Sequence, residues 1–213
     1  MSQATIKKKI PWNSINRLSL YLRELSRLEQ DGKKAVSSSE LADLTDFTDT
    51  QVRKDLSYFG QFGTSGTGYD VSSLKKNIGN ILGKDSVFNV ILVGAGNLGT
   101  ALLSYPGFRG QGFNIKAAFD IDTRKIKQKV SNVDVYDIEN LQSYVKKEKI
   151  KIAILSVPAF SAQKITDMLI ESGISCILNF APIILKVSDQ VLVRNVDLSS
   201  ELESFSFYIK RKE

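Results

Sequence analysis

The sequence of 213 residues contains no histidine and a single cysteine, Cys176. Histidine is the commonest general acid/base and the commonest metal ligand, so we predict neither a catalytic centre nor a metal site. One cysteine excludes an internal disulfide and is typical of a reducing compartment. Its apolar, strand-like surroundings predict a small buried side chain.

Long apolar runs are also missing. No stretch approaches the ~18 residues that a transmembrane helix requires, and the polar, basic N-terminus is unlike a secretory signal. We therefore expect a cytoplasmic protein that makes no membrane contact. The content of 42% hydrophobic residues is that of a globular protein with one large or two small domains.

Acidic residues are fewer than basic ones, which gives a formal net charge of +6. More of the excess lies in residues 1–84 than in the longer remainder, which favours a nucleic-acid surface there. Lys7, Lys8 and Lys9 form a basic arm near the N-terminus. A solvated tail and contact with DNA phosphates are both open interpretations of this arm.

The N-terminal part has the pattern of a helix-turn-helix. Apolar residues at helical spacing predict a first helix over residues 14–29, and the capping boxes at 37–40 and 48–51 begin two shorter helices. The second of these places Val52 and Leu56 on an inward face and leaves a polar face outward. Arginine and glutamine suit base edges, and lysine and hydroxyls suit phosphates. The predicted DNA contacts on this face are Thr50, Gln51, Arg53, Lys54, Ser57 and Tyr58.

A glycine-rich, aromatic segment follows over residues 59–69 and predicts a β-hairpin. A hairpin after a helix-turn-helix is the wing of a winged helix, and we expect Gly66 near its tip to approach DNA. A closing helix over residues 74–82 ends at Gly83, and residues 84–86 are the predicted linker.

The second part opens on a glycine-rich turn. An apolar run leads into Gly94-x-Gly96-x-x-Gly99, and a second buried strand ends on Asp120. Gly94 permits the tight turn, Gly96 lets the backbone approach a pyrophosphate, and Gly99 lets the helix pack closely on the sheet. Asp120 follows at about the spacing, roughly 20 residues, of an acid that binds ribose hydroxyls. The motif predicts a dinucleotide site of the Rossmann type that favours NAD(H) over NADP(H), although Arg124 and Lys125 lie nearby.

Strands and helices continue to alternate through residues 133–196, which predicts a doubly wound parallel sheet. Loops at the carboxyl ends of such strands line the ligand crevice, so we place residues 156–158 and 179–182 beside the cofactor. Val157, Pro158 and Phe180 would disfavour the cationic oxidised nicotinamide and accept the neutral reduced ring. An apolar C-terminal helix could pack either on its own sheet or on another subunit.

Ordered motifs run through both parts, and on them the chain resembles the Rex family of redox-sensing transcriptional repressors of Gram-positive bacteria, over essentially its whole length. The motifs are Ile10-Pro11, Arg17-Leu18-x-x-Tyr21, Val52-Arg53-Lys54-Asp55-Leu56-Ser57-Tyr58-Phe59-Gly60, Gly66-x-Gly68-Tyr69-Asp70-Val71, Gly94-x-Gly96-Asn97-Leu98-Gly99, Phe119-Asp120-x-Asp122, Val157-Pro158, Asn179-Phe180-Ala181-Pro182 and Asn195-Val196-Asp197-Leu198.

The resemblance implies a homodimer that binds an inverted-repeat operator in double-stranded DNA when NADH is scarce relative to NAD⁺, and leaves it when NADH binds. It also implies a C-terminal helix exchanged between subunits, with Arg53 and Lys54 in the major groove. Arg17, Tyr105 and Asp197 resemble polar positions that exchange partners across the domain interface during switching. One departure is the neutral pair 64–65 in the wing, where the family usually carries Lys or Arg, which predicts weaker attraction of the wing to DNA.

The predicted fold is α/β, with a winged-helix DNA-binding domain over residues 1–84, a Rossmann-like NAD(H)-binding domain over 85–197 and a dimerisation helix over 198–213. Two other interpretations are an NAD-dependent dehydrogenase with an N-terminal interaction module and a scaffold that accepts coenzyme A. The lack of histidine argues against the first and Asp120 against the second. The predicted cofactor contacts are Gly94, Ala95, Gly96, Asn97, Leu98, Gly99, Tyr105, Asp120, Ile121, Asp122, Val157, Pro158, Asn179, Phe180, Ala181 and Pro182.

Overall fold

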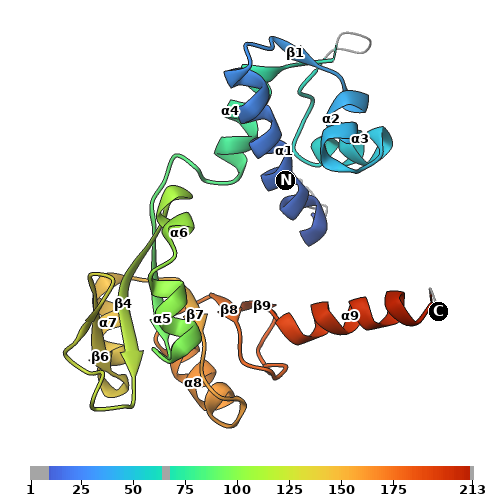
Figure 1. The fold of residues 1–213 in the computed structure, drawn as a ribbon. Helices are drawn as coiled ribbons and strands as arrows, with labels where there is room; N and C mark the ends of the chain where they lie inside the picture. The colour runs from blue at the N-terminus through green and yellow to red at the C-terminus, as the bar shows by residue number, and fades with distance from the viewer. Residues whose placement is uncertain (1–9, 64–67, 212–213) are drawn as a thin grey trace, which may run out of the picture. The chain divides into compact units, whose positions relative to one another are not determined.

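The structure, a computed structural model, describes residues 10–63 and 68–211. The predicted DNA contacts Lys7, Lys8, Lys9 and Gly66 lie outside these residues, as does the neutral pair 64–65. The chain divides into two compact units, Met1–Ser86 and Val87–Glu213 (Figure 1). Each unit has its own hydrophobic core.

The first unit packs its helices around apolar residues of α1, among them Leu18, Tyr21 and Leu25, all fully buried. The two predicted N-caps are confirmed, because Ser37 and Thr48 each accept a hydrogen bond from the backbone N–H three residues on. The elements of this unit are α1 (Trp12–Gln30), β1 (Ala35–Val36), α2 (Ser38–Thr45), α3 (Asp49–Ser57), β2 (Tyr69–Asp70) and α4 (Val71–Ile81).

The predicted hairpin over residues 59–69 is wrong in the part of it that the structure describes. Residues 59–63 form no strand, and β2 pairs antiparallel with β1, which precedes α2 in the chain. Val36 is buried in the core opposite Tyr69, whereas two of the four residues 60–63 are glycines, which have no side chain to pack on a neighbouring strand. A strand is stabilised by the side chains packed on its faces, so β1 is the better partner for β2.

The second unit confirms the predicted doubly wound sheet, in the order β5-β6-β4-β3-β7-β8-β9. Every neighbouring pair is parallel except β5 with β6. The elements are β3 (Phe88–Val93), α5 (Asn97–Leu103), α6 (Pro106–Gly110), β4 (Phe113–Asp120), β5 (Lys129–Val130), β6 (Val133–Asp137), the 3-10 turn η1 (Ile138–Asn140), α7 (Leu141–Glu148), β7 (Ile152–Leu155), α8 (Ala159–Glu171), β8 (Cys176–Asn179), β9 (Leu192–Asn195) and α9 (Leu198–Lys210).

Helices cover both faces of this sheet because successive residues of β3 and β4 point to opposite sides. Ile91 and Phe119 pack with α7 and α8, whereas Leu92 and Ala118 pack with α5. The chain leaves β3 toward β4 on one side and returns to β7 on the other, so the topology reverses beside β3. A crevice at the carboxyl ends of the strands is expected at such a reversal. Cys176 was predicted to be buried but is only partly buried. It is the first residue of β8, at the end of that strand away from the crevice.

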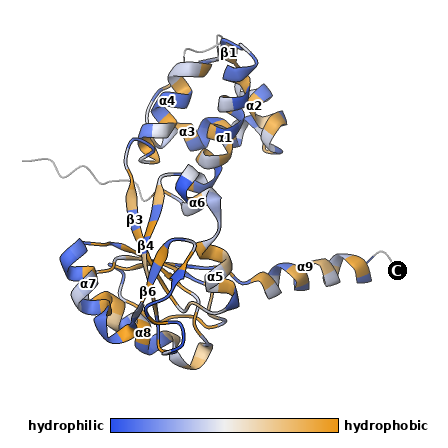
Figure 2. Ribbon diagram, turned by 60° about the vertical axis from the view of Figure 1, so that its left-hand side comes forward, coloured by the Kyte–Doolittle hydropathy of each residue, from blue (hydrophilic) through white to orange (hydrophobic). Residues whose placement is uncertain are grey.

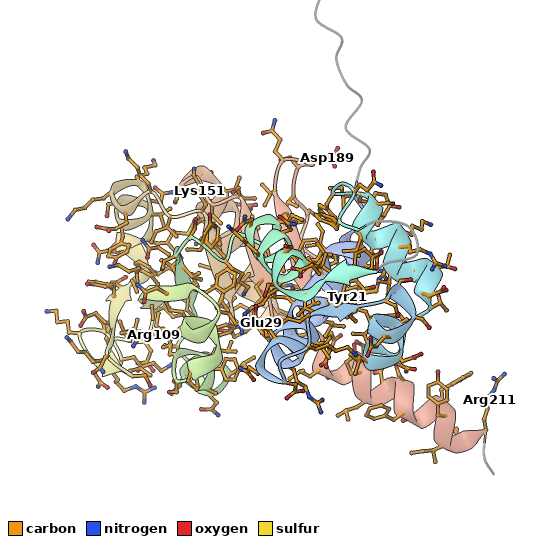
Figure 3. All side chains as sticks on the ribbon, turned by 90° about the horizontal axis from the view of Figure 1, so that it is seen from above. Tyr21, Glu29, Arg109, Lys151, Asp189 and Arg211 are labelled. Atoms are coloured by element: carbon orange, nitrogen blue, oxygen red, sulfur yellow. The ribbon has the colours of Figure 1, made fainter. Side chains whose placement is uncertain are left out.

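The C-terminal helix α9 does not pack on its own sheet, so that alternative is wrong for the chain by itself. All of its residues are exposed, and its six large apolar side chains are 55–66% exposed. Figure 2 shows apolar turns along α9, and Figure 3 shows Arg211 at its far end. These apolar side chains are Leu198, Leu202, Phe205, Phe207, Tyr208 and Ile209.

Candidate functional site

The glycine turn between β3 and α5 has the geometry that its sequence requires. Gly94 has φ +96°, and a Cβ there would meet the carbonyl of Ser156. A Cβ on Gly99 would overlap the carbonyl oxygen of Gly94. At Gly96, by contrast, nothing lies within 4 Å of a Cβ position. The outer glycines are therefore needed by the fold itself, and the space in front of Gly96 fits a group approaching the backbone, such as a pyrophosphate.

A cleft of about 340 Å³ opens beside this turn, at the carboxyl ends of β3, β4 and β7. It brings together seven of the predicted cofactor residues: Gly94, Gly96, Asp120, Ile121, Asp122, Val157 and Pro158. Ser156, within the predicted segment 156–158, also lines the cleft. Residues that the sequence did not indicate as cofactor contacts complete the lining, and they are Val93, Phe119, Lys125, Ile138, Phe160, Ser161 and Ile165.

Phe160 is the most informative of these additions, because its aromatic side chain is 88% exposed. Ile121, on the loop after β4, is also largely exposed on the same cleft. Exposed apolar side chains on a cleft that also holds carboxylates suit a flat ring with polar substituents. The available signal was the position of Phe160 two residues after Pro158, in the first turn of α8.

Asp120 is buried and its carboxylate is largely occupied by the protein. Oδ2 accepts the backbone N–H of Ala95 at 2.8 Å and lies 3.2 Å from Nζ of Lys125. Oδ1 accepts the backbone N–H of Asp122 at 2.9 Å. These bonds join the glycine turn to the loop after β4.

Asp122 lies on the same cleft and is paired with Arg124. Nε and Nη2 of Arg124 lie 2.9 and 2.8 Å from the two carboxylate oxygens, and Oδ1 also accepts the Arg124 backbone N–H at 3.0 Å. The hydrogen bonds from Arg124 lower the pKa of Asp122 to about 2, so this carboxylate is charged at any physiological pH.

The remaining predicted cofactor residues lie outside the lining of this cleft. Asn179 is fully buried, and its side chain bonds to the backbone of Ala181 and Ile183 and to the side chain of Asn195. Ala181 is buried in the core, Phe180 packs against the opposite face of the sheet, and Pro182 is exposed. Ala95 is buried, Asn97 and Leu98 are exposed in α5, and Tyr105 lines a separate pocket of about 230 Å³.

The predicted DNA-contacting face of α3 is exposed at four of its six positions, Thr50, Arg53, Lys54 and Ser57. Arg53 is held by Asp49, with Nη2 2.6 Å from Oδ2, and donates from Nη1 to Oγ of Ser38 at 2.9 Å. Gln51 and Tyr58 are partly buried, and the Gln51 amide donates to Oδ1 of Asp55 at 2.8 Å. Gln51 therefore turns its amide nitrogen toward the interior of the unit.

The predicted switch residues belong to different units. Arg17, in the first unit, pairs with Asp55, and Asp197, in the second, caps α9 by accepting the backbone N–H groups of Ser199 and Ser200. Tyr105 is exposed, with its ring edge-on to Phe108. The exchange of partners among these three residues stays a prediction.

Two negative findings concern residues 10–63 and 68–211. Within them, no group of three or more acidic or cysteine residues is placed to hold a metal ion. Over the same residues, no helix combines the length with the apolar character that crossing a bilayer demands.

Comparison with known proteins relates both units to described families. Residues 85–183 match the family described as "CoA binding domain", and residues 9–57 match "Putative DNA-binding protein N-terminus". The redox-sensing transcriptional repressor Rex of Pelotomaculum thermopropionicum is 45% identical over 205 residues, which cover 96% of each chain. Rex of Carboxydothermus hydrogenoformans is 46% identical over 203 residues, 95% of this chain and 98% of that one.

Solved structures of similar proteins cover nearly the whole chain as well. A crystal structure of RSP in complex with β-NAD⁺ and operator DNA has a TM-score of 0.91 at 40% identity, over 96% of this chain and 94% of that chain. RSP in complex with β-NADH has a TM-score of 0.85 at 39% identity, over 96% of both chains.

Proposed function

This chain belongs to the Rex family of redox-sensing transcriptional repressors, and from that premise we propose that it binds operator DNA through α3 when NADH is scarce and leaves it when NADH binds beside β3. It is a repressor and not an enzyme. NADH and NAD⁺ are its cofactors, and their ratio is the quantity that it senses.

The observation that carries this proposal is the open space at Gly96, next to a cleft edged by Asp120 and Asp122. The same chain exposes Arg53 and Lys54 on the second helix of a helix-turn-helix. Gly96 would admit the pyrophosphate, and the loop after β4 would receive a ribose. The cofactor, when bound, supplies a redox state that can be sensed without any hydride being transferred by the protein.

Discrimination between the two redox states rests on the apolar wall of the cleft. The oxidised nicotinamide ring is a cation and the reduced ring is neutral, so apolar side chains such as Val157, Pro158 and Ile165 disfavour the first. NADH shifts the protein between two arrangements only through its different affinity for them. Half-sites in DNA are spaced by about 34–36 Å or a multiple, so a modest rotation of the DNA-binding domains removes one of the two contacts.

The operator is proposed to be an inverted repeat read by a homodimer. The uncovered apolar side chains of α9 support this, because a helix with six such exposed residues needs a partner surface. In the proposed dimer α9 is exchanged between subunits, and Arg17, Tyr105 and Asp197 change partners during release. Since its target is operator DNA, we place the protein in the cytoplasm.

A gel-shift titration at fixed salt tests the proposal, because affinity for DNA depends strongly on salt. The probe is a double-stranded fragment selected by this protein from a random library. NADH should release the fragment at concentrations at which NAD⁺ leaves it bound. A matched Gly96→Ala protein should bind the fragment equally well and need more NADH for release. If NADH leaves the affinity for the fragment unchanged, the proposed function is wrong.

Coenzyme A is the second candidate ligand, because residues 85–183 match a family described by that name. Coenzyme A carries a phosphate on its ribose, which the carboxylates of Asp120 and Asp122 would repel. Adding coenzyme A to the same titration should therefore leave the complex with DNA intact. Release by coenzyme A and not by NADH would favour this alternative.

A further inference from the structure

The carboxylates of Asp120 and Asp122, at the end of β4 and on the loop after it, lie on one cleft. They differ in how many hydrogen-bond acceptor sites remain free for a ligand. Asp120 accepts three bonds from the protein, from Ala95, Asp122 and Lys125. A carboxylate has about four acceptor sites, so roughly one is left. Its side chain is 9% exposed, against 22% for Asp122. The main role of Asp120 is therefore structural, because its carboxylate holds the backbone N–H of Ala95 in the glycine turn.

Among the residues that the structure describes, those that hold the side chain of Asp122 belong to its own loop. Its partner Arg124 has a side chain that is 87% exposed, and Lys125 is 4.0 Å away. An ion pair so exposed is weakened by solvent, and the guanidinium rotates away at little cost. While the pair lasts, however, the charge of Arg124 is matched by Asp122 and is withheld from any ligand.

We infer that Asp122, and not Asp120, makes this protein choose NADH over NADPH, by adding negative charge to the cleft and by engaging Arg124. The inference rests on the proposed function, because it takes the cleft to be the nucleotide site. A ribose 2′-phosphate carries about −1.5 to −2 charges at pH 7. Beside Asp122 it meets a negatively charged carboxylate, and the two nearby cations each pair with an acid, Arg124 with Asp122 at 2.8 Å and Lys125 with Asp120 at 3.2 Å.

The critical variant is Asp122→Asn, which removes the charge and keeps a side-chain oxygen. That oxygen can still accept the backbone N–H of Arg124, so the turn of the loop is preserved. Lys125, which lines the cleft, and Arg124, whose exposed side chain lies beside Asp122, then have no carboxylate at position 122 and can receive a 2′-phosphate. The double variant Asp122→Asn/Arg124→Ala is the matched control, because it removes the cation expected to bind that phosphate.

Binding is measured directly, by titrating the fluorescence of NADH and of NADPH with each protein. The two nucleotides differ only in the 2′-phosphate, so the ratio of their dissociation constants isolates its effect. We expect Asp122→Asn to lower the dissociation constant of NADPH relative to that of NADH by at least about tenfold. The double variant should lose most of this gain in NADPH affinity. Asp120→Asn should weaken both nucleotides by similar factors, because it loosens the turn that both use.

Two results would overturn the inference. One is a ratio of the NADPH and NADH dissociation constants in Asp122→Asn within about twofold of the wild-type ratio, and the other is a roughly tenfold change of this ratio in the single variant Asp120→Asn. The first is meaningful only with wild-type protein that binds NADH, and it leaves the proposed function standing. Wild-type protein that binds neither nucleotide refutes the proposed function and this inference together. Far-ultraviolet circular dichroism of each variant verifies that the loop substitutions leave the fold intact.

Discussion

Arg17 of α1 and Asp55 of α3 form a two-bond ion pair inside the first unit, with Nε 2.5 Å from Oδ2 and Nη2 2.8 Å from Oδ1. Asp55 is fully buried and also accepts the Tyr21 hydroxyl at 2.9 Å and the Gln51 amide. Figure 3 shows Tyr21 among the helices of this unit. One carboxylate thus fixes α3, the helix that we propose to read DNA, to α1, and any movement of Arg17 away from it leaves a buried charge short of its partner.

Replacing Asp55 by alanine should lower the free energy of unfolding by about 3 kcal/mol, because it leaves Arg17 and Tyr21 without their acceptor. The fluorescence of Trp12, the one tryptophan of the chain and part of α1, reports this unfolding in urea. Asp49→Ala on the same helix is the control, since the ion pair of Asp49 is exposed to solvent. Equal losses in the two variants would contradict the special position of Asp55.

The same carboxylate should make stability depend on pH. Burial alone would raise the pKa of Asp55, but hydrogen bonds from Arg17, Ser14, Tyr21 and Gln51 together hold it below its ordinary value. A lowered pKa stabilises the folded state above the pKa of unfolded aspartate, about 3.9, and this stabilisation disappears as the pH falls through the folded value. The advantage of wild type over Asp55→Asn in urea should thus be constant from pH 7 to about pH 5 and shrink below about pH 4. An advantage that grows toward acid pH would refute this assignment.

The glycines of the phosphate turn should separate stability from binding. Gly96 has an ordinary φ of −74° and open space around its Cβ position. The free energy of unfolding of Gly96→Ala should therefore lie within about 1 kcal/mol of the wild-type value. Its methyl group occupies the approach to the backbone, so we expect NADH affinity to fall at least about tenfold. Gly99→Ala should instead lower stability, because its methyl group overlaps the carbonyl of Gly94. Thermal unfolding and NADH fluorescence titration distinguish the two outcomes, and similar behaviour of both variants would be evidence against the assigned roles.

Arg53 and Lys54 should contribute to DNA binding in different ways. Arg53→Ala should cost about 1–3 kcal/mol and relax the sequence preference at one base pair, whereas Lys54→Ala should weaken all sequences alike. The lysine variant should also reduce the slope of log affinity against log salt by about 1. Lys76→Ala on α4 is the control for lost charge, since Lys76 is exposed on another helix. Fluorescence anisotropy with a panel of single-base variants measures both effects, and identical profiles for Arg53 and Lys54 would rule out separate roles.

The apolar face of α9 should determine oligomeric state. Leu202 and Phe205 lie three residues apart on one face of α9 and are 66% and 59% exposed, so Leu202→Glu with Phe205→Glu should turn a dimer into a monomer. Ser204→Glu adds charge on another face of the helix and should leave the dimer intact. Analytical ultracentrifugation at micromolar concentration distinguishes these states. A dimer that survives the double substitution would place the subunit interface elsewhere.

Local signals were sufficient for most of the elements. Ser37 and Thr48 were predicted as caps because a hydroxyl near free backbone N–H groups is a short-range signal, and both were found in that role. The spacing of Val52 and Leu56 predicted the buried face of α3. Asp55, three residues after Val52, lies on the same face, but the sequence did not indicate its burial because aspartate is rarely buried. The hairpin was wrong for a different reason, since the partner of β2 is a strand that lies far upstream in the chain.

The sequence by itself determined the helix-turn-helix, the parallel-sheet class and the glycine turn, because periodicity and backbone sterics act over a few residues. Only the tertiary structure decided which acceptor each donor reaches. Asp120 accepts a bond from Ala95, Asn179 bonds to Asn195, and Phe160 lines the cleft. In each case the fold brings together segments that are distant in the sequence. A polar residue type specifies how many bonds it can make, but the packing of distant segments determines whether the protein or a ligand receives them.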